Sequence, residues 1–60
     1  MFVVGDIVYL ISGGPAMTIQ QHQRDGEWIS HECCWIDEDG HVQKEWFDSR
    51  TITKELGEES

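Results

Sequence analysis

The chain has 60 residues, with twelve acidic and four basic side chains and a formal net charge of −8 at pH 7. A chain of this length forms one domain and buries only about 60% of the surface that its unfolded form exposes, so we expect a thin core. The negative charge repels phosphate backbones and argues against nucleic-acid binding. No apolar run approaches the roughly 20 residues of a transmembrane helix.

Two adjacent cysteines, Cys33 and Cys34, are the only thiols. Successive side chains of an extended strand point to opposite faces, so these two cannot easily form a disulfide with each other. With no disulfide framework and no secretory signal in the sequence, we expect a reducing, cytoplasmic setting.

The N-terminal half contains two apolar segments on either side of a glycine-rich turn. The first segment, Phe2–Ile11, is rich in strand-forming residues; Gly5-Asp6 interrupts it, so we expect the strand itself to begin at Ile7. Two glycines that tolerate positive φ and a proline that lacks an amide donor predict a tight structural turn over Ser12, Gly13, Gly14 and Pro15. Apolar and polar residues then alternate through Ala16–Gln23, which predicts a half-buried strand.

The C-terminal half continues this pattern of short strands between turns. An Asp-Gly hairpin signal within Arg24–Glu27 precedes the third strand, an acidic turn precedes the fourth, and one helical turn precedes a short closing strand. In chain order, the third strand is Trp28–Ile36, the acidic turn is Asp37–Gly40 and the fourth strand is His41–Phe47. The helical turn is Asp48–Arg50 and the closing strand is Thr51–Thr53.

No stretch of the chain keeps a helical period, so the sequence predicts an all-β fold. We expect an antiparallel meander of five strands that forms a small SH3-like barrel, with a short 3-10 turn before the last strand and with closure removing the exposed sheet edges. Residues 1–54 are assigned to this single domain and residues 55–60 to a flexible acidic tail.

Two blocks of residues resemble a known family. The first comprises Val4-Gly5-Asp6-Ile7-Val8, Leu10, Ser12-Gly13-Gly14-Pro15 and Met17-Thr18-Ile19, and the second comprises Cys33, Trp35, Asp37, Gly40, Val42, Glu45 and Phe47, followed by Ile52. This pattern is similar to that of the YodC-like family of small bacterial and phage proteins. The resemblance implies an SH3-like barrel and no particular reaction. The chain departs from the family pattern at Ile36 in place of an aromatic residue, at the extra thiol of Cys34, and at the large side chains of Trp28 and Trp46.

Strand alternation divides the apolar residues into a core set and a surface set. The core set is Val8, Leu10, Met17, Ile19, Cys33, Trp35, Phe47 and Ile52. Alternation turns five further apolar residues outward, namely Ile7, Tyr9, Ile11, Trp28 and Trp46. This is a large apolar surface for such a charged chain, so either bulges fold part of it into the core or it forms an interface, and a homodimer is our hypothesis for that interface.

Residue patterns that would indicate chemistry are weak. Five residues could each bind a metal but lack the paired spacing of small zinc domains: His22, His31, Cys33, Cys34 and His41. Catalysis by a cysteine would need a neighbouring base and a pocket, and carboxylates in the solvated Asp37–Asp39 turn would stay ionised. The Ser12–Pro15 turn lacks the lysine and the following helix of a phosphate-binding loop. We therefore expect no enzymatic activity, no catalytic residue, no cofactor and no bound metal.

Two functions compete on this evidence. The first is a non-enzymatic protein-interaction module that binds itself or another protein through its strand edges and through Tyr9, Trp28 and Trp46. The second is an acidic decoy that imitates nucleic acid on a basic protein surface. Its charged face would consist of Asp25, Glu27, Glu32, Asp37, Glu38, Asp39, Glu45 and Asp48. Binding of RNA is disfavoured because the chain has only four basic residues.

Overall fold

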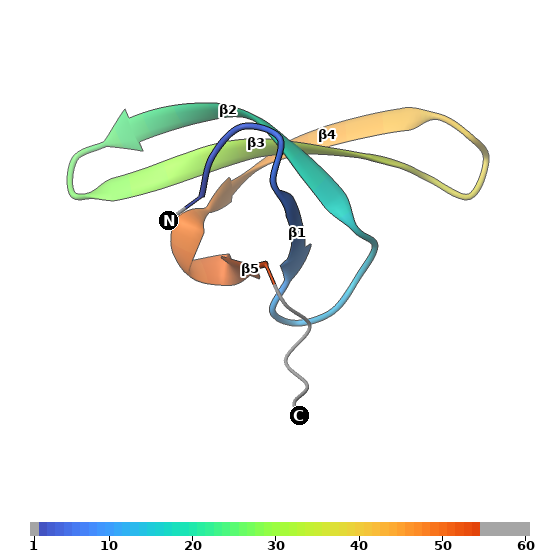
Figure 1. The fold of residues 1–60 in the computed structure, drawn as a ribbon, viewed down its shortest axis with the longest axis horizontal. Helices are drawn as coiled ribbons and strands as arrows, with labels where there is room; N and C mark the ends of the chain where they lie inside the picture. Colours follow the sequence, from blue (N-terminus) through green and yellow to red (C-terminus); the bar gives the residue numbers. More distant parts are fainter. Residues whose placement is uncertain (1, 55–60) are drawn as a thin grey trace.

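The computed structural model describes residues 2–54, which form one antiparallel sheet with the strand order β4-β3-β2-β1-β5 (Figure 1). The elements are β1 (Ile7–Leu10), β2 (Met17–Asp25), β3 (Trp28–Ile36), β4 (Val42–Asp48), the 3-10 turn η1 (Ser49–Thr51) and β5 (Ile52–Thr53). The prediction of an all-β, five-stranded fold with a 3-10 turn before the last strand is confirmed, and this strand order is that of an SH3-like barrel. The predicted tail, residues 55–60, lies outside the described residues.

Strands β2, β3 and β4 form two long hairpins that extend in opposite directions (Figure 1). Asp25 pairs with Trp28 across the first hairpin, so its loop is only Gly26-Glu27, and Gly26 has φ +66°. Positive φ suits this tight connection because glycine has no Cβ to clash with the backbone. The second hairpin turns through residues 37–41. In the part of the chain that the structure describes, no helix is long and apolar enough to cross a membrane.

The predicted structural turn over Ser12, Gly13, Gly14 and Pro15 connects β1 to β2. The amide of Gly13 donates a hydrogen bond to the carbonyl of Leu10 at 2.9 Å. Gly13 and Gly14 have φ values of +110° and +131°. L-residues with a side chain rarely adopt these angles, so the conformation of this turn requires both glycines.

A β-bulge interrupts the pairing of β2 with β3. Ile19 pairs with Cys33 and Gln21 pairs with Glu32, so Gln20 is an extra residue in β2. An extra residue shifts the alternation of side chains by one position from there on.

The core lies between β2–β3 on one side and β1 with β5 on the other. Its buried residues are Val8, Met17, Ile19, Cys33 and Ile52, with Phe2, Leu10, Trp35 and Phe47 packed against them. The structure thus places every residue of the predicted core set in or against the core and adds Phe2.

Closure of the barrel differs from the prediction. Among residues 2–54, β5 pairs only with β1 and β4 pairs only with β3. β5 contains only two residues and uses them to pair with β1, so it does not reach the far edge of β4. The sheet is bent but not closed by hydrogen bonds, and β4 keeps one open edge.

Candidate functional site

The outer face of the sheet, which is turned away from the core, carries both predicted surface tryptophans. Trp46 of β4 lies directly opposite Glu32 of β3, and Trp28 lies at the hairpin end of β3. The two residues are 41% and 46% exposed. The row formed by Ser30 and Asp48 separates them, so they do not form one continuous aromatic patch.

Trp28 is partly covered by a cation. The guanidinium carbon of Arg50 lies 3.3 Å from the centroid of the Trp28 ring. Asp48 holds this guanidinium with two hydrogen bonds, Nε to Oδ1 at 2.9 Å and Nη2 to Oδ2 at 2.8 Å. Because of the hydrogen bonds from the Arg50 side chain and backbone amide, the pKa of Asp48 falls to about 2. Trp28 is therefore engaged within the chain.

The other predicted surface residues lie elsewhere. Ile7 of β1 is 49% exposed and belongs to the outer face, in the row of Thr18. Tyr9 is half-buried and pairs with Thr53 of β5, and Ile11 is exposed just after β1. The five residues are thus spread over the molecule, and Trp46 is the one that lies on an open strand edge.

Glu32 is buried, which corrects the expectation that it belongs to a charged surface. It is 7% exposed, and its Oε1 accepts hydrogen bonds from Nε2 of Gln20 at 2.8 Å and from Nε2 of Gln21 at 2.5 Å. The bulge makes this possible because it sets two consecutive residues opposite one. The amide of Gln21, and then that of Gln20, lowers the pKa of the Glu32 carboxyl. Sequence reasoning missed this cluster because polar residues on a strand usually indicate an exposed face.

The open edge of β4 carries exposed apolar side chains. Val42 is 69% exposed and Trp46 is 41% exposed, and Ile36, which pairs with Val42, is 64% exposed. Only Lys44 and Glu45 interrupt the edge with charges before Asp48. β4 pairs with β3 over its whole length with no bulge.

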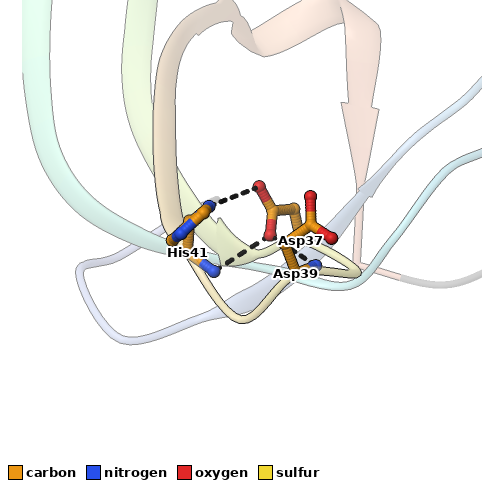
Figure 2. A group of neighbouring side chains, drawn as sticks. All are labelled: Asp37, Asp39 and His41. Atoms are coloured by element: carbon orange, nitrogen blue, oxygen red, sulfur yellow. Dashed lines mark hydrogen bonds and ion pairs between the residues drawn. The ribbon is translucent and has the colours of Figure 1, made fainter.

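The possible metal ligands identified in the sequence do not come together as one group. His22 contacts His31, while His41 lies in the turn between β3 and β4 beside Asp37 and Asp39 (Figure 2). One ligand atom from each of Asp37, Asp39 and His41 lies within 4.8 Å of the others, and both Asp39 and His41 are exposed.

The carboxylate of Asp37 is already used to build this turn. Its Oδ1 accepts hydrogen bonds from the backbone amides of Asp39 and His41, each at 2.9 Å (Figure 2). Its Oδ2 accepts one from Gln43 Nε2 at 2.8 Å. The Gln43 amide, followed by the backbone amide of His41, lowers the pKa of Asp37. The arrangement explains the turn without any ion.

The two cysteines are free and face opposite sides of β3. Cys33 is fully buried, and its Sγ lies 3.7 Å from the carbonyl oxygen of His31. Burial raises the pKa of the Cys33 thiol, and the neighbouring Cys34 and Glu32 raise it further. A protonated thiol is a poor nucleophile, so the site favours a packing role for Cys33.

The strand order, the 3-10 turn and the bulged second strand define a small all-β protein of the SH3-like class. The chain belongs to the family described as an uncharacterized small protein family, DUF2158, whose model matches residues 3–52. This match covers the residues that resemble the YodC-like family and is consistent with that resemblance. No curated protein and no solved structure matches the chain.

Proposed function

We propose that this chain is a non-enzymatic, cytoplasmic protein-interaction module that forms homodimers by antiparallel pairing of β4 with β4 of a second copy. The observation that supports this most is the open edge of β4. Its seven residues pair with β3 on one side and, within residues 2–54, with no strand on the other. Unpaired N–H and C=O groups along an edge form a template for another strand.

β4 has few of the features that protect natural edge strands. Proteins commonly protect an edge with proline, a bulge, lysine or inward-pointing charges, and of these β4 has only Lys44 and Glu45. β4 contains neither proline nor a bulge, and it exposes Val42 and Trp46. Pairing with a second copy would satisfy its backbone groups and cover the Trp46 ring.

The charges of β4 select one register for this pairing. A two-fold axis perpendicular to the sheet relates the two paired β4 strands. Residues directly opposite each other must lie on the same face of the sheet, so the axis passes between one residue and its own copy. An axis at Lys44 or at Glu45 would place that charge opposite its own copy, which is destabilising. An axis at Trp46 places the two Trp46 rings together and places Lys44 opposite Asp48 of the second copy.

Light scattering tests the dimer. We expect a mass of twice the 6.9 kDa chain mass at high concentration, with dissociation on dilution. Trp46→Lys puts two ammonium groups at the two-fold axis and should give a monomer that keeps its circular dichroism spectrum. Ile36→Lys, which adds the same charge at a 64% exposed residue outside the pairing register, should remain dimeric. A monomer mass at every concentration would overturn the proposal.

The register has its own test. Lys44→Glu places a carboxylate opposite Asp48 of the second copy at two symmetric positions, so the dimer dissociation constant should rise about tenfold, given roughly 0.2–1 kcal/mol for each cross-strand pair. Raising the salt concentration should reduce this difference because the charges are exposed. An unchanged dissociation constant would exclude the axis at Trp46.

The acidic decoy has weaker support. Three of the eight carboxylates expected on the decoy face already have partners within the chain. Glu32 accepts hydrogen bonds from two glutamine amides, Asp48 is paired with Arg50, and Asp37 accepts a backbone hydrogen bond in the β3–β4 turn. A pulldown of lysate proteins at low and high salt distinguishes the two functions, because basic partners held only by charge would be lost at high salt.

A further inference from the structure

A groove lies on the inner side of the hairpin formed by β2 and β3 and extends to Ser49, which follows the end of β4. Its volume is about 590 Å³. This is within the range of roughly 300–1,000 Å³ that is typical of small-molecule sites. The lining residues are Phe2, His22, Arg24, Ile29, His31 and Ser49. Phe2 and Ile29 give the groove apolar walls, and the other four residues supply polar groups.

The β-bulge creates this combination of residues. Without the extra Gln20, strict alternation would turn His22 and Arg24 towards the outer face. With it, both side chains point to the same side as His31 and Ile29 of β3, with which they pair. The groove is therefore a product of the register shift.

His31 is the buried polar residue of the groove. It is 3% exposed, and its Nδ1 lies 2.6 Å from Nδ1 of His22. One proton is shared between these two atoms, so one ring donates and the other accepts. The Nε2 atom of His31 is buried and, within residues 2–54, has no hydrogen-bond partner. Buried polar atoms in proteins nearly always have a partner, so an unpaired imidazole nitrogen beneath the groove is unusual.

Arg24 supplies an uncompensated positive charge in a chain of net charge −8. Arg50 is paired with Asp48 and Lys54 with Asp6, whereas the Arg24 side chain makes no ion pair with any of residues 2–54. A guanidinium binds a carboxylate with two parallel hydrogen bonds. The hydroxyl group of Ser49 adds a further donor to the groove.

We propose that this groove binds a small apolar carboxylate. The apolar body lies between Phe2 and Ile29, and the carboxylate accepts hydrogen bonds from Arg24 and from Ser49. The assignment does not rest on the proposed dimer, which uses the backbone edge of β4.

An NMR titration of the full chain with 3-phenylpropionate at pH 7 tests this. We expect a dissociation constant on the order of 1 mM, as suits a ligand of this size. Amide shifts should be confined to the residues that line the groove. The neutral amide 3-phenylpropanamide should bind about tenfold more weakly, because it lacks the charge that Arg24 recognises.

Two exposed cations provide matched variants. Arg24→Gln should weaken binding of 3-phenylpropionate about tenfold, whereas Lys54→Gln should leave it unchanged, because Lys54 pairs with Asp6 and does not line the groove. Equal affinity for the carboxylate and the amide, an unchanged affinity in Arg24→Gln, or shifts centred on Trp46 would each overturn the assignment.

Discussion

At the scale of single residues, Gln20 has the largest effect on the arrangement of polar groups. As the extra residue of the bulge, it brings its own amide and that of Gln21 to the carboxylate of Glu32. The same insertion places His22 beside His31. One residue therefore accounts for a buried carboxylate on one face of the sheet and a histidine pair on the other.

His31 makes the stability of the fold depend on pH. Burial, and then the nearby His22, lowers its pKa below the ordinary value of 6.5, while Asp48 acts in the opposite direction. The unfolded chain therefore binds a proton at His31 more readily than the native chain. The free energy of unfolding should be highest above about pH 6.5 and should fall as the pH drops through the lowered native pKa.

Urea unfolding at about pH 8, 6.5 and 5.5 measures this dependence, in a range above the titration of the carboxyl groups. In His31→Leu the dependence should shrink. In His41→Gln it should persist, because the side chain of His41 is 74% exposed in the β3–β4 turn. If both variants retain the full dependence on pH, another group must be responsible.

At the scale of the elements, the hairpin between β2 and β3 depends on the backbone conformation of Gly26. A Cβ added to Gly26 would meet no atom within 4 Å, so its φ of +66° is the only obstacle to substitution. Gly26→Val should lower the free energy of unfolding by about 1–2 kcal/mol, and Gly26→Asn by less, because asparagine tolerates this region. Thermal unfolding of both variants measures the difference. An equal loss in both would show that crowding, and not φ, limits the position.

At the scale of the whole molecule, a very small core sets the stability. Among residues 2–54, five apolar residues are buried, and Ile19 is the largest of those that are completely buried. A typical stability of about 0.05–0.15 kcal/mol per residue gives this chain roughly 3–9 kcal/mol. Removing any one of these side chains therefore threatens the fold.

Ile19→Ala should lower the free energy of unfolding by about 2–5 kcal/mol and leave a substantial fraction of the chain unfolded at 25 °C. Ile36→Ala removes the same atoms from a 64% exposed residue and should change it by less than about 0.5 kcal/mol. Urea unfolding of both at one protein concentration makes the comparison, because the stability of a dimer depends on concentration. Similar losses in the two variants would mean that Ile36 is covered by a partner.

Local signals in the sequence were enough to predict most of the elements. β3 has the predicted bounds, Trp28–Ile36, and β1 begins at Ile7 as expected. β2 runs on to Asp25, past the predicted end at Gln23, because the hairpin loop needs only two residues. Turn residues and strand alternation act over a few positions, so they can be recognised without knowing which strands pair.

The sequence by itself thus determined the all-β class, the approximate positions of the strands and most of the residues that face the core. Only the tertiary structure decided that Gln20 is a bulge, that Glu32 is buried and that His22 contacts His31. It also decided that, among the described strands, β4 pairs on one edge only. The reason is that strand register and strand order depend on pairing between residues far apart in the chain. The alternation of apolar and polar residues along one strand does not reveal an inserted residue. It also does not indicate with which strand the two-residue β5 pairs.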